Sequence, residues 1–427
     1  MPNYNVQEAF WLRPRPADKL ADMARKRRVK RLEPPIRVEL MLGAVTLDGS
    51  VAAEYEGRKV FVDYGMPGER VVAEIDIERP HALFGRVVEV LEAAPGRVEA
   101  PCEYFGECGG CQWQHVAYER QLEFKRELVV GQLQRIGGFE EPPVSPTVGA
   151  ENPWGYRNHV RFTAKSRGEI GFVRRGTHRF LRIDHCLIAD DWVNDAIPLI
   201  QGKAGGLHQV AIRRGVKTGE LLVHPNLDHL GTSIPSGQKF YHEEVLGHRF
   251  RISAASFFQT NTQQAERLIR LVRDKLQLRP FETLVDAYAG VGTFAVVLAE
   301  HVKRVIAIEE SSAAVDDALV NIEGSPHIQY YMGKVEDVLG GIDEEMDALI
   351  LDPPRVGVHA AAIEAVLRKA PGRIAYVSCD PSTLARDLRL LVDGLADGAR
   401  YDLVDVTPVD MFPQTHHIEC VASLRRA

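Results

Sequence analysis

Hydrophobic and polar positions follow three different patterns along the chain. Between residues 35 and 92 they alternate in short runs, which predicts β-strands separated by turns such as Asp48-Gly49 and Pro67-Gly68. The predicted strands are residues 37–47, 59–63, 70–77 and 86–91. Several short strands in one stretch predict a small β-barrel of the OB type, which often binds nucleic acid, although a purely structural barrel would show the same pattern.

A helical pattern follows. Apolar residues recur at helical spacing over residues 118–136, and Gly137-Gly138 then ends the run, which predicts a helix. A proline-rich break comes next, and residues 154–255 indicate mixed, mostly β structure.

From about residue 256 helical and strand patterns alternate, as in a doubly wound α/β domain. The predicted helices are 262–276 and 293–301, and the predicted strands are 283–287, 304–308 and 347–351. The predicted domains are a tail (1–34), the barrel (35–92), a central domain (93–255) and the α/β domain (256–427).

Charge is distributed unevenly. The net charge is −7, from 52 basic and 59 acidic residues, which argues against nonspecific binding to polyanions. However, residues 13–31 hold nine Lys or Arg, and residues 157–182 hold eight, interleaved with Phe162, Phe172 and Phe180. This interleaving suits a surface that binds phosphates and stacks bases, although a solvated face would also be basic. No apolar run is long enough to span a bilayer, so we expect a cytoplasmic protein.

A glycine-rich turn follows the first strand of the α/β domain, in ETLVDAYAGVGTFAVVLAE. Gly290 and Gly292 allow close approach of a ligand at a helix N-terminus, and Glu309 ends the next strand, where it can accept both hydroxyls of a ribose. The turn also satisfies a dinucleotide pattern, so NAD competes as the ligand.

Three further features favour S-adenosylmethionine over NAD. Asp286 closes the first strand near Tyr288, which suits a carboxylate facing the methionine ammonium beside an aromatic ring. Asp352 begins the run Asp-Pro-Pro-Arg at the end of a later strand, where methyltransferases hold their target base. Cys379 ends another strand, so these side chains are expected at one edge of the sheet.

Cys379 suits methylation at carbon. Carbon 5 of a pyrimidine is a poor nucleophile until a thiolate adds to carbon 6, and Cys379 could supply that thiolate. The alternative is that Cys379 is an inert, packed cysteine. Ser382 or Thr383 is expected to cap a following helix that would favour the thiolate. The carbon 5 proton then needs a base, and the run His416-His417-Ile-Glu419 offers candidates.

The chain resembles the RNA uracil-5-methyltransferase family over nearly all of its length after residue 35. The resemblance includes the barrel, which is similar to a TRAM domain, and the motifs CEYFGECGGCQWQH, FFQTNTQQAE, DAYAGVGTF, DPPR, SCDP and THHIE. It implies a C-terminal Rossmann-like S-adenosylmethionine methyltransferase domain, an N-terminal OB-type barrel and a mixed central α+β domain.

The resemblance also implies residue roles. Cys379 would be the nucleophile and Glu419 the proton acceptor, with Gln259, Tyr288 and Glu309 contacting the cofactor. Glu336 and Asp352 would also contact it, and Asp286 and Gly290 complete the predicted cofactor site. Ser-Cys-Asp-Pro and Thr293 depart mildly from the family pattern, which blurs the subfamily but not the reaction.

Six cysteines in a cytoplasmic chain do not indicate disulfides. Cys102, Cys108 and Cys111 have C-x5-C-x2-C spacing, and with Cys186 they make four thiols that match a [4Fe-4S] cluster. Zinc competes, since Cys111 and His115 also have ligand spacing. The resembled family often carries the cluster, so iron is favoured in a structural role, and Cys420 is expected to pack as a small hydrophobe.

Together these features predict an enzyme that methylates carbon 5 of a uridine in structured RNA, with 23S rRNA favoured and uridine 54 of tRNA as the alternative. An amino-nitrogen methyltransferase is disfavoured because Arg355, rather than an aromatic residue, follows the two prolines. A cytosine target is disfavoured because no cysteine accompanies Asp352. A noncatalytic RNA-binding or redox-sensing protein on the same fold remains the other alternative. We expect a monomer without an obligate protein partner or a membrane.

Overall fold

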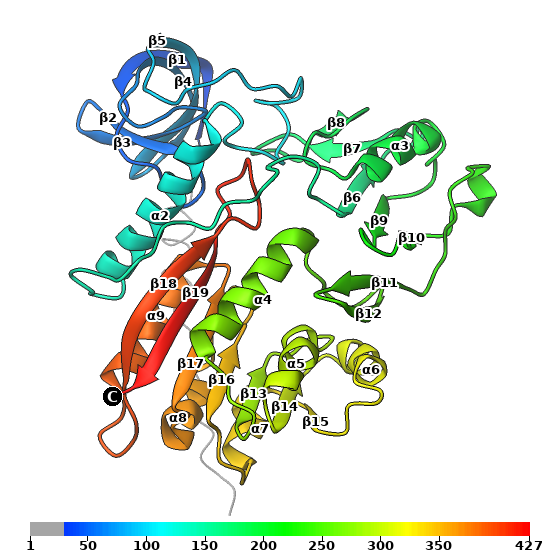
Figure 1. Cartoon of the computed structure of the whole chain (residues 1–427). Helices are drawn as coiled ribbons and strands as arrows, with labels where there is room; N and C mark the ends of the chain where they lie inside the picture. Colours follow the sequence, from blue (N-terminus) through cyan, green and yellow to red (C-terminus); the bar gives the residue numbers. More distant parts are fainter. Residues whose placement is uncertain (1–29) are drawn as a thin grey trace, which may run out of the picture. The chain divides into compact units, whose positions relative to one another are not determined.

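The computed structural model describes residues 30–427, which divide into two compact units (Figure 1). One unit holds residues 30–46 and 50–95, and the other holds residues 47–49 and 96–427. The predicted basic tail lies outside the described residues as far as residue 29. Among residues 30–427, no helix has the length and apolar character needed to cross a membrane.

The first unit is one five-stranded sheet with the strand order β1-β4-β5-β3-β2. Its strands are β1 (Lys30–Met41), β2 (Val51–Tyr55), β3 (Arg58–Asp63), β4 (Arg70–Arg79) and β5 (Ala82–Glu92). β3 and β5 run parallel, and the other neighbours are antiparallel. Alternate residues such as Val60, Val62 and Ile75 are buried in its core, as the polar–apolar alternation predicts.

One strand of this unit was not predicted. The expected strand 37–47 ends at Met41, and β2 forms instead over Val51–Tyr55. β2 pairs with β3 across the turn Glu56-Gly57, whose φ angles of 48° and 73° are the left-handed values that such hairpin turns need. β2 is short and contains two alanines, so its strand pattern is weak.

The second unit begins with the predicted helix α2, observed over Tyr118–Arg135. An antiparallel sheet follows with the order β10-β9-β6-β7-β8, and a separate hairpin follows it. The sheet strands are β6 (His159–Ala164), β7 (Ile170–Val173), β8 (Phe180–Arg182), β9 (Gln209–Arg214) and β10 (Leu221–His224), and the hairpin is β11 (Phe240–Val245) and β12 (His248–Ser253). Helix α3 (Asp191–Ile200), which was not predicted, packs its buried face on this sheet.

The remainder of the second unit is a seven-stranded sheet with the order β15-β14-β13-β16-β17-β19-β18. Its strands are β13 (Thr283–Ala287), β14 (Arg304–Glu309), β15 (Ile328–Met332), β16 (Ala348–Leu351), β17 (Arg373–Ser378), β18 (Tyr401–Val409) and β19 (Glu419–Arg426). The first five are parallel, whereas β19 runs antiparallel to both β17 and β18. The chain order reverses around β13, which makes its carboxyl end the expected ligand-binding edge.

Helices pack along this sheet (Figure 1). They are α4 (Thr262–Leu276), α5 (Thr293–Leu298), α6 (Ser312–Asn321), α7 (Val335–Val338), α8 (Ala360–Lys369) and α9 (Pro381–Asp393). α4 has the predicted limits, because Asn261 caps its first turn and its buried residues recur at helical spacing. The predicted helix 293–301 is α5 followed by a 3₁₀ turn over Ala299–His301.

Candidate active site and cysteine pocket

Four candidate residues lie at one edge of the seven-stranded sheet because the strands end level with one another. Where β13 pairs with β14 and β16, the last paired residues are Ala287, Ile308 and Leu351. Tyr288, Glu309 and Asp352 come directly after these positions, and Cys379 comes directly after β17. We call this set, with Glu419, the strand-end site.

Glu419 joins this edge from the opposite chain direction. β19 is antiparallel to β17, and the last recorded pair of the two strands is Ser378 with Cys420, so Cys379 and Glu419 are the residues that directly adjoin this pair. Glu419 is only 5% exposed. The Glu419 charge also raises the pKa of Cys379, so the thiol and the buried carboxyl group lie near each other.

The glycine-rich turn is tied to Glu309. One carboxylate oxygen of Glu309 accepts the Gly290 N–H at 2.8 Å, and the other accepts the Ser311 N–H at 2.7 Å. A Cβ atom on Gly292 would lie 2.8 Å from the Tyr330 hydroxyl, and its φ is +93°, so a side chain there would meet both a clash and a strained backbone. The carboxylate keeps lone pairs for two ribose hydroxyls.

Asp286 is fully buried beneath this turn. One of its oxygens accepts the Ala295 N–H at 3.0 Å, but the other has no hydrogen-bond partner within the described residues. Burial raises the pKa of Asp286 well above its ordinary value, and the charges of Asp352 and Glu309 raise it further. Such an oxygen suits a cationic donor, as the ammonium of S-adenosylmethionine would be.

Two further predicted cofactor residues, Glu336 and Gln259, lie outside the strand ends and the glycine-rich turn. Glu336 lies in the first turn of α7, and its charge is among those that raise the pKa of Tyr288, so it faces the site. Gln259 is half-buried in the segment before α4, two residues from Asn261, whose side chain donates to the Met411 carbonyl at 3.1 Å. Gln259 therefore lies on the α4 side, near the segment that leads to Glu419.

Electrostatics at the strand-end site favour neutral groups. Burial raises the pKa of Cys379 to about 11, and the Glu419 charge adds to this. Burial also raises the pKa of Asp352 to about 7 and that of Glu419 well above its ordinary value. The positive charge of Arg355 lowers the pKa of both Cys379 and Glu419 and so favours their charged forms.

Arg355 was read only as a feature of the Asp-Pro-Pro turn, and its electrostatic role was missed. Its position after Asp352 in the sequence was the available signal.

The predicted caps of the helix after Cys379 were wrong. Asp380 caps α9 by accepting the Ser382 and Thr383 N–H groups at 2.8 and 3.2 Å, because Pro381 already occupies the first helical position.

The two histidines before Glu419 are poor candidates for a base. Burial lowers the pKa of His416 to about 3 and that of His417 to about 4. Their rings lie against each other, with centroids 4.3 Å apart. Burial has the opposite effect on Glu419, whose pKa it raises well above the ordinary value of a glutamate.

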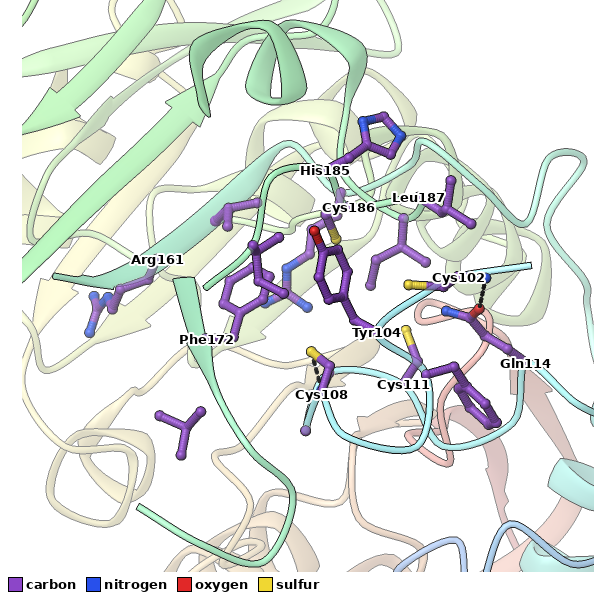
Figure 2. Close-up of a pocket in the computed structure, with 18 residues that line it drawn as sticks. Cys102, Tyr104, Cys108, Cys111, Gln114, Arg161, Phe172, His185, Cys186 and Leu187 are labelled. Atoms are coloured by element: carbon purple, nitrogen blue, oxygen red, sulfur yellow. Dashed lines mark hydrogen bonds between the residues drawn. The ribbon is translucent and has the colours of Figure 1, made fainter. Parts of the chain in front are cut away.

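The four predicted cysteine ligands line a separate cavity of about 360 Å³ (Figure 2). Cys102, Cys108 and Cys111 come from the loop before α2, and Cys186 comes from the segment after β8. Figure 2 shows Tyr104 among them. No residue of the strand-end site lines this cavity, whereas Cys420 is fully buried within β19.

The thiols of this cavity are not arranged as a finished ligand set. Within residues 30–427 no three Cys, His, Asp or Glu side chains stand close enough to hold a metal ion as they are. All four cysteines are free thiols, and the Gly110 N–H donates to the Cys108 sulfur at 3.4 Å. The donor chemistry fits an iron–sulfur cluster, because each of four thiolates would bind a different iron atom and the sulfurs need not converge on one ion.

The basic stretch 157–182 is only partly the surface that was predicted. Phe162 is completely buried and stacks on the half-buried Phe172, with ring centroids 5.3 Å apart, so the expectation that Phe162 stacks on bases was wrong. β6 alternates, and Phe162 falls on its inner face. Phe180 is half-buried beneath the Lys165 ammonium. The exposed arginines of the stretch are Arg161, Arg167, Arg179 and Arg182.

Comparison with known proteins gives consistent matches. The family model described as tRNA (uracil-5-)-methyltransferase matches residues 183–329 and 338–427. An uncharacterized RNA methyltransferase of Halalkalibacterium halodurans is 34% identical, over 91% of this chain and 96% of its own. Another, of Gloeobacter violaceus, is 35% identical over 88% and 93%.

A solved structure is also similar. It is the tRNA (uracil-54, C5)-methyltransferase of Pyrococcus abyssi in complex with S-adenosyl-L-homocysteine. It has a TM-score of 0.69 and 26% sequence identity, and the match covers 91% of this chain and all of the other. The comparison shows a methyltransferase fold with mixed sheets for this chain.

The raised pKa of Cys379 predicts how it reacts with iodoacetamide, which consumes only the thiolate. From pH 7 to 10 the rate at Cys379 should rise about tenfold per pH unit, because a pKa of about 11 lies above this range. Arg355→Gln should slow alkylation at every pH in the range, because it removes a charge that lowers the pKa, and Arg355→Lys should restore much of it.

Mass spectrometry of the Cys379 peptide measures the rate. Arg368→Gln, at an exposed arginine on α8, is the matched control and should change nothing. A rate that levels off below pH 9, or an Arg355→Gln protein that reacts normally, would contradict the assignment.

Proposed function

The chain belongs to the tRNA (uracil-5-)-methyltransferase family, and we propose that it methylates carbon 5 of one uridine in a structured RNA through a covalent bond from Cys379 to carbon 6. Family membership makes it an S-adenosylmethionine-dependent RNA methyltransferase, a transferase of class EC 2.1.1. The observation that supports the finer proposal is the register of β17 with β19, whose last pair, Ser378 with Cys420, directly adjoins Cys379 and Glu419.

In the first half of the proposed reaction, the Cys379 thiolate adds to carbon 6 of the uracil ring. The electron pair moves through carbon 5 to the carbonyl oxygen at carbon 4, and the resulting enolate makes carbon 5 nucleophilic. S-adenosylmethionine supplies an electrophilic methyl group when bound. Arg355 favours the thiolate, because its positive charge opposes the rise in the Cys379 pKa.

In the second half, Glu419 removes the proton that remains on the methylated carbon 5. The electron pair of that C–H bond re-forms the double bond between carbons 5 and 6, and the bond from carbon 6 to the Cys379 sulfur breaks. Glu419 suits this step because its raised pKa makes the carboxylate a strong base. The pair must lie on the same edge, because both act on neighbouring atoms of one ring.

The proposed cofactor residues surround the glycine-rich turn. Glu309 would accept the ribose hydroxyls, and the unpartnered oxygen of Asp286 would accept the methionine ammonium. Tyr288 and Glu336 flank this space, and Gly290 lets the cofactor approach the backbone. Gln259 and Asp352 complete the proposed set from the α4 and β16 sides.

The RNA substrate is proposed in two forms. The resemblance in the sequence favours 23S rRNA, whereas the Pyrococcus abyssi enzyme acts on uridine 54 of tRNA. In either case the base must leave its stack to reach the strand-end site. We place the enzyme in the cytoplasm, as a monomer without an obligate protein partner, because an RNA substrate requires neither a membrane nor a second chain.

We also propose that the first unit is an OB-type, TRAM-like barrel that contacts RNA. Its strand order and its parallel β3–β5 pair support this, because closing β1 onto β2 would produce a five-stranded OB barrel. The proposed domain boundaries remain 35–92, 93–255 and 256–427, with the central domain supplying the cysteine cavity and the exposed arginines.

A [4Fe-4S] cluster on Cys102, Cys108, Cys111 and Cys186 is the proposed occupant of the cysteine cavity. Support comes from four free thiols, brought from two distant segments to one cavity, and zinc is the alternative. Bound to these thiolates, the cluster would tie the loop before α2 to the segment after β8.

The covalent mechanism predicts opposite behaviour for two variants. Cys379→Ala should abolish both turnover and any covalent link to RNA, because no thiolate can add to carbon 6. Glu419→Gln should still transfer the methyl group but stall in elimination, so a denaturation-resistant protein–RNA adduct carrying the new methyl group should accumulate. Each protein is incubated with methyl-labelled cofactor and either a 23S rRNA fragment or tRNA, both unmodified, and run on a denaturing gel.

Equal adduct with Cys379→Ala would remove the thiol from its role. Free methylated RNA produced at the normal rate by Glu419→Gln would remove the carboxylate from its role. The RNA that yields adduct and product also decides between the two substrates, and a protein that binds RNA but methylates neither would favour the noncatalytic alternative.

The cluster proposal predicts a brown protein with a broad visible absorption band after purification without oxygen. Cys108→Ser should bleach it and lower its thermal stability, since a ligand is lost. Cys379→Ser is the control and should keep the colour, because Cys379 does not line the cavity. Metal analysis accompanies the spectra, and one zinc per colourless chain would show that the cavity holds zinc instead.

The exposed arginines predict a salt-dependent RNA contact. Changing Arg161, Arg167 and Arg179 together to Gln should weaken RNA binding and flatten its dependence on salt, by about 0.7 to 0.9 in log–log slope per lost phosphate contact. The matched control changes Arg270, Arg368 and Arg389. These arginines lie on α4, α8 and α9, and each is paired with a carboxylate four residues away on its own helix.

Binding is measured from 50 to about 200 mM salt, the range over which phosphate contacts change affinity most visibly. Cofactor affinity should not move in either triple variant. If the two triples weaken RNA binding equally, the stretch 157–182 is an ordinary solvated face.

A further inference from the structure

The segment 410–418 connects β18 to β19 and ends at Glu419, yet it is neither helix nor strand. Asp410, Met411, Gln414 and Thr415 in this segment are nevertheless buried. Buried backbone outside regular structure must find hydrogen-bond partners elsewhere, so its position is determined by the groups that bind it.

Each of the five carbonyl groups from 410 to 414 accepts a hydrogen bond from a distant element. The side chains of Gln264 and Asn261, at the start of α4, donate to Asp410 and Met411 at 2.9 and 3.1 Å. The remaining donors are Lys125 to Phe412 (3.2 Å), Tyr156 to Pro413 (3.0 Å), and the N–H groups of Gln112 and Trp113 to Gln414 (both 3.0 Å).

Gln414 is the point where these contacts are densest. Its N–H donates to the Gln121 side-chain oxygen at 3.0 Å, and the Gln121 amide nitrogen donates back to the Gln414 side-chain oxygen at 3.0 Å. The same nitrogen lies 2.9 Å from the Val116 carbonyl. Both glutamines are buried, with Gln121 completely inaccessible.

Gln414 also has a backbone conformation that needs support. Its φ is +69°, in the left-handed region that residues other than glycine rarely adopt. Such a conformation persists where the surroundings hold it in place, and here the paired amides of Gln121 and Gln414 do so. The carbonyl of Gln414 then points at the loop that directly follows Cys111.

We propose that Gln121 and Gln414 are positioning residues for Glu419. The pair holds the 410–418 segment against α2 and the loop after Cys111, and so sets where β19 begins and where the Glu419 carboxylate lies relative to Cys379. This inference rests on the proposed role of Glu419 as the base. It goes beyond that role because neither glutamine touches the RNA or the cofactor in the proposed reaction.

The proposal predicts a defect confined to the second half of the reaction. Gln121→Leu removes the paired amides at similar side-chain size. Addition and methyl transfer need Cys379, which is on β17, so a single round of methyl transfer should stay within about threefold of the parent, whereas turnover should fall at least about tenfold. The labelled protein–RNA adduct should accumulate as it does for Glu419→Gln, with little change in KM.

Gln201→Leu is the matched control. Gln201 also bridges backbone groups through its amide, donating to the carbonyls of Ile170 and Ile183 at 3.0 and 2.8 Å, but these groups belong to β7 and the segment after β8. It should lose stability without accumulating adduct. Gln414→Asn is the second variant: Asn tolerates the left-handed backbone but is too short to reach Gln121, so it tests the same contact if Gln121→Leu does not fold.

The outcomes separate the two levels of the proposal. If Glu419→Gln accumulates adduct but neither Gln121→Leu nor Gln414→Asn does, the positioning role is wrong and the proposed reaction stands. If the Glu419→Gln protein itself accumulates no adduct, the proposed reaction fails first. Parallel losses of methyl transfer and turnover in the glutamine variants, as in a simply destabilised protein, would also overturn the positioning role.

Discussion

The antiparallel pairing of β19 with β17 is the constraint on which the strand-end site depends. Parallel strands all end at the edge where ligands bind, whereas an antiparallel strand begins there. Glu419 is the first residue of β19, and the last pair of the two strands, Ser378 with Cys420, directly adjoins Cys379 and Glu419. A slip of one residue would turn every β19 side chain to the other face of the sheet, and the carboxyl group would leave the thiol.

A buried ion pair joins helix α2 to the segment that leads into β19. Lys125 of α2 and Asp410 at the end of β18 are both completely inaccessible, with 2.5 Å between nitrogen and oxygen. Burial lowers the pKa of Lys125, and the Asp410 charge opposes this shift. Because removing one partner of such a pair leaves an uncompensated buried charge, at a cost of roughly 3–5 kcal/mol, the pair fixes α2 against the segment before Glu419.

The strand-end site is less favourable to folding than an ordinary core. Asp286, Asp352 and Glu419 all have raised pKa values because they are buried, and the Asp352 charge raises those of Asp286 and Glu419 further. A carboxyl group whose pKa is raised by folding stabilises the fold only while protonated, so the contribution of Asp352 is lost as the pH rises through about 7. Burial raises the pKa of Glu419 and that of Cys379 alike, and Arg355 offsets both shifts in part.

The sequence by itself determined the elements whose signals are local. The limits of α4, the β13 strand and the glycine-rich turn appear where they were predicted, because propensity, capping and spacing act over a few residues. It also determined that Cys379 follows a strand. Local patterns could not show which face of β6 Phe162 occupies, and that residue turned out to be core.

Only the tertiary structure decided which distant residues meet. The pairing of Ser378 with Cys420, of Lys125 with Asp410 and of Gln121 with Gln414 joins positions up to 293 residues apart. No short pattern encodes such contacts, because they follow from strand order and from the burial of segments that are irregular by themselves. The sequence therefore supplied the chemical groups of the candidate site, and the order and register of the strands decided how these groups face one another.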